Sequence, residues 1–265
     1  KTQAAMTEKT EEEMFATMER SLQVMKESVQ DGLDKDKRSA SGLTGGDAYK
    51  LNEALKAGKN IAGHFFGNAM MKAVAVAQTN ACMGRIVASP TAGSCGILPS
   101  ALLTLQEEKN ISDKDLVMAL FTASAVGIVI ATNASVAGAA GGCQAECGAA
   151  SAMAAAAMVE LCGGTPKQCE HACAIALKNI LGLVCDPVAG LVEIPCIKRN
   201  AGGVGNALVA AELALAGVES HIPADEVIVA MKKIGDTMSS TLKETAEGGL
   251  AVTPTGKKLC EKVFG

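Results

Sequence analysis

The stretch CGAASAMAAAAMVELC, residues 147–162, sets the character of the whole chain. It is rich in alanine and ends at Gly163-Gly164, a typical helix stop. The same bias runs through all 265 residues, of which 49% are hydrophobic but only 2% aromatic, with no Trp. A core built from Ala, Val, Leu, Ile and Met lets helices approach one another closely. We therefore predict an all-α fold, a compact Ala/Gly-rich helical domain with irregular loops that carry cysteines.

Helix signals continue on both sides of this stretch. Ser112 with Asp115 is an N-terminal signature that opens a long apolar helix, which we expect Gly138, Gly141 and Gly142 to break. Further helices are expected to start at Thr10, where Glu13 completes a capping box, and at Thr165-Pro166, and to cover residues 60–84, 203–216 and 223–235. No convincing run of alternating or β-branched residues predicts a strand.

The charged residues 31–41 are typical of a linker. We therefore divide the chain into an N-terminal helix and linker, residues 1–40, and one larger domain, residues 41–265. The larger domain begins with the small-residue loop SGLTGGD, whose last residue, Asp47, is expected to cap the next helix. Residues 185–199 contain two prolines and are expected to be irregular.

Charge and composition exclude several classes of protein. The net charge of −4 and the lack of basic clusters with interleaved aromatics argue against a nucleic-acid binder. Residues 116–145 carry no charge and are long enough to span a bilayer, but they contain Ser, Thr and Asn among many Ala and Gly, which provide little drive for insertion. Since the N-terminus shows no apolar signal-peptide core, we expect this helix to be buried inside a soluble, cytoplasmic protein that does not bind membranes.

The chain has ten cysteines. Without a secretory signal they argue against a disulfide framework and for reduced thiols, some of them metal-binding. Cys143, Cys185 and Cys196 lie beside glycine or proline, a setting that suits ligation of an inorganic cluster, and for these three the spacing leaves ligation and simple burial equally open. Small buried hydrophobes are expected at Cys82, Cys162, Cys169 and Cys173.

Three segments resemble the iron–sulfur-dependent L-serine dehydratases: GRIVASPTAG at residues 84–93, GCQAE at residues 142–146 and CDPVAGLVEIPCIKRN at residues 185–200. The similarity runs from about Ser41 to the end, and the stretch around DPVAG is highly specific. The chain looks like the α chain of the two-chain bacterial type, in which a separate β chain carries an additional α/β domain. The resemblance thus implies a heteromeric enzyme whose partner is that β chain.

The resemblance also implies a [4Fe-4S] cluster held by three cysteines, with the fourth iron open to substrate. Residue by residue, these ligands fall on Cys143, Cys185 and Cys196. Some single-chain relatives place a C-terminal cysteine into the open position, but Cys260 is followed by EKVFG and is left out of the ligand set. The implied reaction is β-elimination of L-serine to pyruvate and ammonia, in which the open iron acts as a Lewis acid on the β-hydroxyl and a base removes the α-proton.

The base is not fixed by these segments. His64 has a side chain that titrates near neutrality, Lys243 is a weaker candidate, and the base can equally come from the β chain. Glu146 and Asp186 lie beside the presumed ligands as supporting partners and are not expected to be catalytic. His171 and His221 look like surface or cap residues.

Two loops have the small residues that backbone anion binding needs, and we expect them to bind the substrate carboxylate. The residues concerned are Ser41, Gly42 and Thr44 in the first loop and Thr91, Gly93 and Ser94 in the second. An ordinary turn followed by a helix cap is the alternative interpretation of both loops.

Three other functions are compatible with parts of this pattern. A lyase that eliminates hydrogen sulfide from L-cysteine would use the same kind of cluster. A non-catalytic iron–sulfur redox or sensor protein would need a fourth protein ligand, such as Cys95 or Cys147. A pyridoxal-phosphate dehydratase would match the glycine-rich residues 201–206 but lacks an accompanying lysine motif.

Overall fold

The structure, a computed structural model, describes residues 1–265 with the exception of the side chain of Thr2. The described residues form helices joined by loops, with no β-strand among them, and the all-α prediction is confirmed. The α-helices are α1 (Thr2–Thr7), α2 (Glu11–Gly32), α3 (Asp47–Lys56), α4 (Gly63–Ala81), α5 (Ile97–Lys109), α6 (Asp113–Asn133), α7 (Gly138–Gly141), α8 (Cys143–Leu161), α9 (Pro166–Lys178), α10 (Cys196–Leu215), α11 (Ala224–Thr237) and α12 (Pro254–Phe264). Short 3-10 helices are η1 (Val188–Gly190), η2 (Ser240–Leu242) and η3 (Gly249–Val252).

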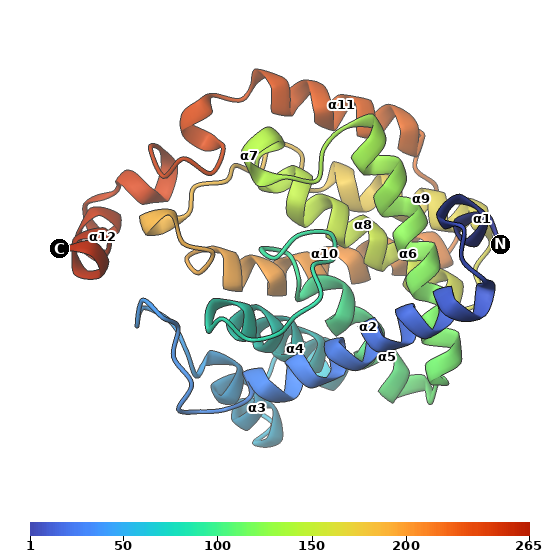
Figure 1. Cartoon of the computed structure of the whole chain (residues 1–265), viewed down its shortest axis with the longest axis horizontal. Coiled ribbons are helices and arrows are strands. Elements are labelled where there is room, and N and C mark those ends of the chain that lie inside the picture. Colours follow the sequence, from blue (N-terminus) through green and yellow to red (C-terminus); the bar gives the residue numbers. More distant parts are fainter.

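Helix α8 is the centre of the fold, with α5, α6, α9 and α10 packed around it (Figure 1). Its residues from Cys143 to Val159 are all buried. Small residues make this possible because they let neighbouring helices come close. At Gly203 of α10, a Cβ would lie 2.3 Å from Cδ1 of Ile97 in α5, so a larger residue there would displace the buried Ile97 side chain. The expected close helical packing is therefore observed.

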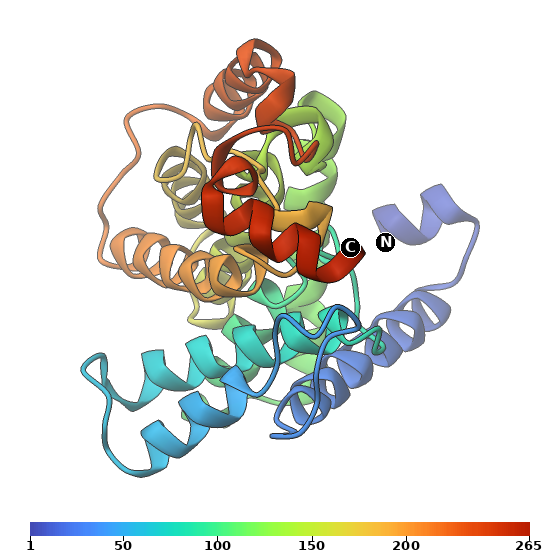
Figure 2. The same cartoon turned by 90° about the vertical axis from the view of Figure 1, so that its left-hand side faces the viewer.

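Helix α4 forms the next layer, in contact with α2, α3, α5 and α10 (Figure 2). Gly32, the last residue of α2, crosses α4 so closely that a Cβ would lie 2.0 Å from the carbonyl oxygen of Ala75. Helix α2 is thereby packed into the same hydrophobic core as α4. The first helix α1 and the last helix α12 lie at opposite ends of the longest axis (Figure 1).

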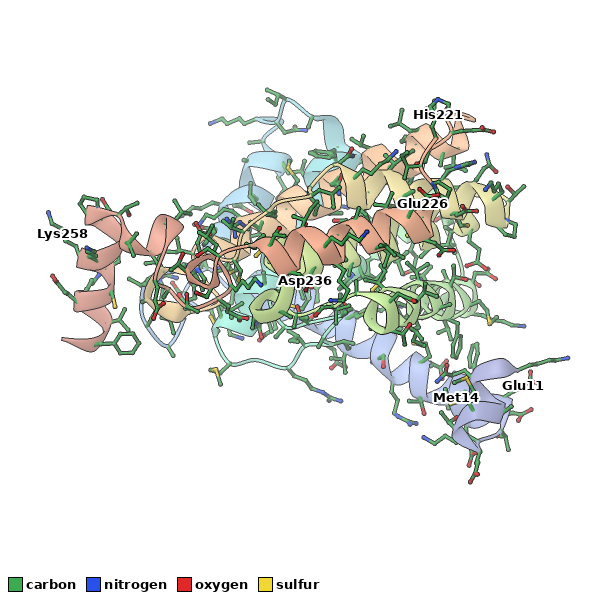
Figure 3. All side chains as sticks on the ribbon, turned by 90° about the horizontal axis from the view of Figure 1, so that it is seen from above. Glu11, Met14, His221, Glu226, Asp236 and Lys258 are labelled. Atoms are coloured by element: carbon green, nitrogen blue, oxygen red, sulfur yellow. The ribbon has the colours of Figure 1, made fainter. Side chains whose placement is uncertain are left out.

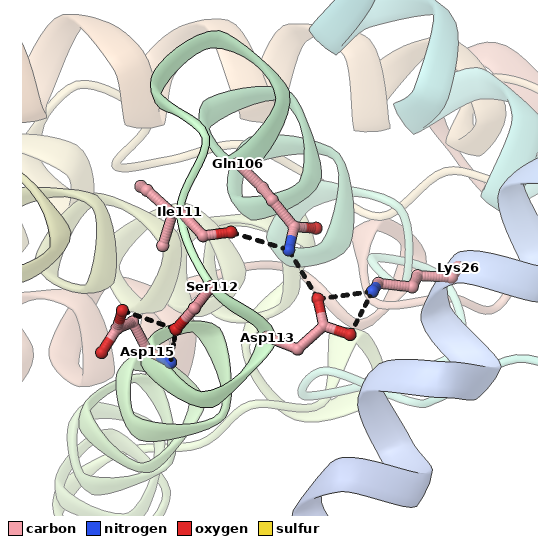
Figure 4. Close-up of polar contacts among 6 residues, drawn as sticks. All are labelled: Lys26, Gln106, Ile111, Ser112, Asp113 and Asp115. Carbon is pink, nitrogen blue, oxygen red and sulfur yellow. Dashed lines mark hydrogen bonds and ion pairs between the residues drawn. The ribbon is translucent and has the colours of Figure 1, made fainter.

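The predicted helix starts at Thr10, Ser112 and Thr165 are confirmed. Thr10 and Thr165 both form complete capping boxes, and Ser112 Oγ accepts a hydrogen bond from the amide of Asp115 at 3.2 Å. Figure 4 shows how the start of α6 is held in place: Asp113 pairs with Lys26 of α2 at 2.7 Å and accepts a hydrogen bond from Gln106 of α5 at 2.6 Å. The consecutive helices α5 and α6 are thus joined to the distant helix α2 at one point.

Some predicted boundaries are wrong. The apolar helix α6 already ends at Asn133, and residues 138–141, expected to break it, form the short helix α7. Asp47 does not cap α3 but is its first residue, and its carboxylate pairs with Lys50 and Lys198. The segment expected to be irregular up to residue 199 becomes helical at Cys196, since α10 begins there.

Helix α6 is long and apolar enough, by length and composition, to cross a membrane, although only 39% of its most apolar window is buried. One face packs against α2 and α8, while Met118, Ile128 and Val129 are exposed on the other. The expected burial of this helix is therefore observed on one face only. The buried face is what places α6 in the helical core.

Candidate functional site

Cys143, Cys185 and Cys196 come from three separate segments and are all buried. Cys143 is the first residue of α8, Cys185 lies in the loop between α9 and η1, and Cys196 is the first residue of α10. All ten cysteines are free in the structure. The helix packing around α8 therefore gathers thiols that are far apart in the sequence.

Cys143 is fixed by the way α8 begins. Gly142 adopts a φ of 75°, and a Cβ there would lie 2.8 Å from the carbonyl oxygen of Leu183, so glycine is needed at this position. Gln144, which follows Cys143, donates its backbone N–H to the same Leu183 carbonyl at 2.9 Å. Its side-chain oxygen accepts a hydrogen bond from the backbone N–H of Gly182 at 2.9 Å. The start of α8 is thus tied to the loop that leads to Cys185.

Cys185 is held by the C-terminal segment. Its amide donates to the carbonyl of Leu242 at 2.9 Å, and its carbonyl accepts from the amide of Glu244 at 2.8 Å, forming an isolated bridge between Cys185 and Lys243. Lys243, expected to be a weak candidate for the base, therefore has its backbone directly beside Cys185. The structure brings this predicted residue to the cysteines.

Cys196 is anchored through Asn200, one turn further along α10. The fully buried Asn200 side chain donates to the carbonyls of Cys196 at 3.0 Å and Gly93 at 2.7 Å, and accepts from the amide of Gly96 at 2.8 Å. One amide side chain thus binds the loop of residues 91–96 to the start of α10. Two predicted parts of the site, this loop and Cys196, are joined in this way.

Arg199 connects the segments that carry the cysteines. Its Nη1 donates to Cys143 Sγ at 3.3 Å and to the carbonyl of Val184 at 2.8 Å, and its Nη2 pairs with Asp186 Oδ1 at 2.8 Å. The other oxygen of Asp186 accepts the amide of Leu250 at 2.8 Å. A positively charged, largely buried group is thus aimed at the thiols.

The four thiols at the start of α8 and nearby differ sharply in acidity. Hydrogen bonds from Cys147 and Cys185, followed by the charge of Arg199, lower the pKa of Cys143 to about 3. Hydrogen bonding to that thiolate, together with burial, raises the pKa of Cys147 and of Cys185 far above the usual value. Burial raises the pKa of Cys196 to about 12. The site therefore stabilises the thiolate of Cys143, through hydrogen bonds from two thiols and the charge of one arginine.

Glu146, one turn after Cys143 on α8, lies between two glycines. A Cβ on Gly93 would lie 1.8 Å from its Oε1, and a Cβ on Gly138 would lie 3.1 Å from its Oε2 and also 3.1 Å from Cys185 Sγ. Burial, with the nearby Cys143 charge, raises the pKa of Glu146 to about 7, although the Thr91 side chain hydrogen bonds to it and partly opposes the shift. A buried carboxyl that titrates near neutrality thus lies beside the thiols.

The first predicted substrate loop contacts the chain's own acidic residue. Ser41 Oγ donates to Glu193 Oε1 at 2.8 Å, and Thr44 Oγ1 donates to Glu193 Oε2 at 2.6 Å. Glu193 is buried and lies three residues before Cys196, whereas Gly42 is exposed. In the second loop, Thr91 Oγ1 and Ser94 Oγ are 3.1 Å apart.

The histidines lie away from the cysteines. His64 is exposed at the start of α4, where the neighbouring Phe66 packs on Gly205 of α10. Gly205 is nine residues beyond Cys196, which is about 13 Å along a helix. His171 is buried, and its Nδ1 accepts the amide of Ser220 at 3.2 Å, so the surface interpretation of His171 is wrong. His221 is exposed at the edge of the molecule, as expected (Figure 3).

Three residues with clear roles in the site, Glu193, Arg199 and Asn200, received no role from the sequence. A signal for two of them existed, because Arg199 and Asn200 follow Cys196 at the spacings that place residues on one face of a helix. Nothing local marks Glu193, since its partners Ser41 and Thr44 lie about 150 residues earlier.

The donor set is made of sulfur and is distributed over several segments. Among the described residues, no group of three or more His, Cys, Asp and Glu side chains is arranged to hold a single metal ion. Thiolates that bind different irons of one cluster need not converge on a single atom, and thiolates are the usual ligands of such clusters. Buried thiols from three segments with an arginine beside them therefore fit an iron–sulfur cluster better than a single ion.

Comparison with known proteins gives consistent results over nearly the whole chain. A family model described as Serine dehydratase alpha chain matches residues 1–251. A protein of Bacillus subtilis named "Probable L-serine dehydratase, alpha chain" is 56% identical over 260 residues, which cover 98% of this chain and 86% of that protein. The "L-serine dehydratase, alpha chain" of Peptoniphilus asaccharolyticus is 47% identical over 94% of this chain and 86% of its own length. The "L-serine dehydratase" of Streptomyces coelicolor is 47% identical over 68% of this chain, but this match covers only 40% of that longer protein.

Proposed function

The chain belongs to the serine dehydratase alpha-chain family, and from this membership we propose that it eliminates water from L-serine, which yields pyruvate and ammonia after tautomerisation and hydrolysis. The observation that carries the proposal is the convergence of Cys143, Cys185 and Cys196 around Arg199. These three cysteines match the ligand positions that the sequence resemblance implies. They would hold a [4Fe-4S] cluster.

When bound, the cluster supplies a Lewis acid that favours departure of the β-hydroxyl of serine. The protein supplies a setting from which bulk water is largely excluded, because all three cysteines and Glu146 are buried. In such a setting the electrostatic effect of nearby charges is larger than in water.

Glu146 is the group that takes the α-proton from the substrate on one of its carboxylate oxygens. Its position supports this role, because a Cβ built on Gly138 would lie 3.1 Å from both Glu146 Oε2 and Cys185 Sγ, so the carboxylate and the expected ligand border the same space. The hydrogen bond with Thr91 orients the carboxyl, and its pKa of about 7 allows it both to accept and to release a proton near neutral pH. This assignment replaces His64, which is exposed at the start of α4, and it departs from the expectation that Glu146 only supports the ligands.

Thr91, Gly93 and Ser94 border Glu146 and form the side of the site where the substrate is oriented. Ser41 and Thr44 act differently. Their hydroxyls bind Glu193 and so hold the segment that leads to Cys196. Gly42 allows the turn between them through its φ of 72°. Lys243 contributes through its backbone next to Cys185.

The enzyme is completed by a β chain. The name alpha chain in the matched family and in two relatives supports a second kind of subunit. The Streptomyces coelicolor relative, less than half of which is matched, is consistent with a further part that this chain leaves to a partner.

The test is anaerobic preparation of the chain together with its β chain, followed by iron and sulfide analysis and an assay for pyruvate. We expect iron and sulfide to be bound, pyruvate to form from L-serine, and the absorption or paramagnetic signal of the cluster to change when L-serine is added. Turnover of L-cysteine in preference to L-serine would assign the chain to the sulfide-eliminating reaction instead. A cluster whose absorption and paramagnetic signals do not change with any amino acid would support a redox or sensor role.

A further inference from the structure

Arg199 links the three chain segments that carry the expected ligands. It follows Cys196 by three residues on α10, so the two lie on the same face of that helix. Its Nη1 donates to Cys143 Sγ itself. It also bonds both chain neighbours of Cys185, through the carbonyl of Val184 and the carboxylate of Asp186.

Only an arginine can make this set of contacts. The guanidinium presents five N–H donors in a rigid plane, so it can address a sulfur, a carbonyl and a carboxylate at once. A lysine would keep the charge but bring its donors from a single nitrogen. The neighbouring Lys198 is exposed and pairs with Asp47 at the surface, away from the cysteines.

The guanidinium is itself held in place. Its side chain is only 17% exposed and pairs with Asp186, which is 5% exposed. Asp186 is in turn fixed by the amide of Leu250 at 2.8 Å, from the C-terminal segment. A buried ion pair of this kind fixes geometry, because each partner would be costly to leave without the other.

We propose that Arg199 is a positioning residue that sets the relative placement of Cys143, Cys185 and Cys196 and raises the reduction potential of the cluster they hold. The proposal rests on the cluster of the proposed function. The second part follows from electrostatics: an N–H donor and a positive charge beside a ligand sulfur favour the reduced cluster, which carries one more negative charge.

The variants that test it are Arg199→Met, Arg199→Lys and the control Lys198→Met, each prepared anaerobically with the β chain. Iron and sulfide per chain are measured first. The midpoint potential of the cluster is then obtained from a reductive titration followed by the paramagnetic signal of the reduced form. Circular dichroism of each variant monitors the fold.

We expect Arg199→Met to retain less iron than the wild type and to show a more negative potential. Arg199→Lys should restore part of the potential, because the charge returns, but not the full iron content, because the planar fork is lost. Lys198→Met should match the wild type in both. If Arg199→Met does not fold, the test uses the cluster potentials of Arg199→Lys and of Asp186→Asn instead. Asp186→Asn removes the carboxylate that holds the guanidinium in place.

Wild-type potential and iron content in the folded Arg199 variants would overturn the proposal while leaving the cluster itself intact. A wild-type protein that binds no iron or sulfide would overturn the proposed cluster, and the role of Arg199 with it. The two failures are therefore distinguishable before any activity is measured.

Discussion

The carboxylate of Glu146 occupies the space that a side chain on Gly93 would need, since a Cβ built on Gly93 would lie 1.8 Å from Glu146 Oε1. Gly93 belongs to the loop before α5, and Glu146 to the first turn of α8. The position of the buried carboxyl therefore depends on the absence of a side chain in another segment. A substitution at Gly93 can therefore move the Glu146 carboxyl while position 146 keeps its glutamate.

Gly93→Ala should leave the protein folded but lower kcat/KM for L-serine by about tenfold or more, which corresponds to at least 1.4 kcal/mol of lost transition-state stabilisation. The methyl group forces the Glu146 carboxyl away from Thr91 and from the thiols. Gly202→Ala is the matched control, because no atom lies within 4 Å of its ideal Cβ and it stands on the exposed side of α10. Equal activity of the two variants would remove Glu146 from the reaction.

Glu146→Gln should change how stability depends on pH in the cluster-free protein. The folded pKa of about 7 lies above the ordinary glutamate value of 4.5, so the carboxyl stabilises the fold fully below pH 4.5, and this contribution is lost as pH rises through about 7. Urea unfolding should therefore show the wild type losing about 3 kcal/mol relative to Glu146→Gln across that interval.

The control for this pH effect is Glu247→Gln, at an exposed position of the C-terminal segment. Its unfolding free energy should follow that of the wild type at every pH. Parallel pH profiles of Glu146→Gln and the wild type would contradict the burial of an ionisable group at position 146.

Replacing each expected ligand by serine should abolish stable cluster binding. Cys143→Ser, Cys185→Ser and Cys196→Ser are each expected to lose most iron and sulfide, because a hydroxyl is a poor substitute for a thiolate on iron. Cys162→Ser, at the opposite end of α8 from Cys143, should keep the full content.

Cys147→Ser separates the catalytic from the redox interpretation. Cys147 is buried and hydrogen bonds to Cys143, so it is the thiol best placed to act as a fourth ligand. An open iron predicts that Cys147→Ser retains iron and still responds to L-serine. Loss of the cluster in this variant would favour a closed, non-catalytic centre.

Lys72 is a buried charge whose removal should not weaken the fold. Its side chain is 6% exposed on α4, and it pairs with Glu107 of α5, which also accepts a hydrogen bond from Asn68. Burial lowers the pKa of Lys72, against the opposing effect of Glu107. Because the pKa of Lys72 is lower in the folded state than in the unfolded state, burying its charged form lowers the stability of the fold at neutral pH. The stability gains from this group only between its folded pKa and the unfolded value of 10.5, where the folded protein has already lost the proton.

Lys72→Met is therefore expected to be neutral or stabilising, whereas Glu107→Gln should cost about 1 kcal/mol because it leaves the buried ammonium with a weaker partner. Glu107 is more than half exposed, which keeps this figure small. Thermal and urea unfolding of the two variants at pH 7 measure the difference. A strongly destabilised Lys72→Met would show that the ion pair, and not the packing of the stem, holds α4 against α5.

Much of the helical framework follows from local sequence. The starts at Thr10, Ser112 and Thr165 were predictable because a cap and the amide it accepts lie within one turn. The end of α6 at Asn133 was not predictable from local sequence. The glycines expected to end the helix lie further along the chain, and Gly138 and Gly141 belong to the separate helix α7. Asp47 likewise looked like a cap but pairs instead with Lys198, a partner that only the folded chain brings near.

By itself the sequence determined the helical class of this protein, its family-like cysteines and the small residues that let helices meet, because these depend on composition and on contacts within a turn or two. Only the tertiary structure decided which groups face each other: Arg199 and Cys143, Asn200 and Gly96, Glu146 and Gly93. Such pairs arise when α5, α8 and α10 bury their faces together. That burial depends on the whole core and leaves no fixed spacing in the sequence from which the partners could be found.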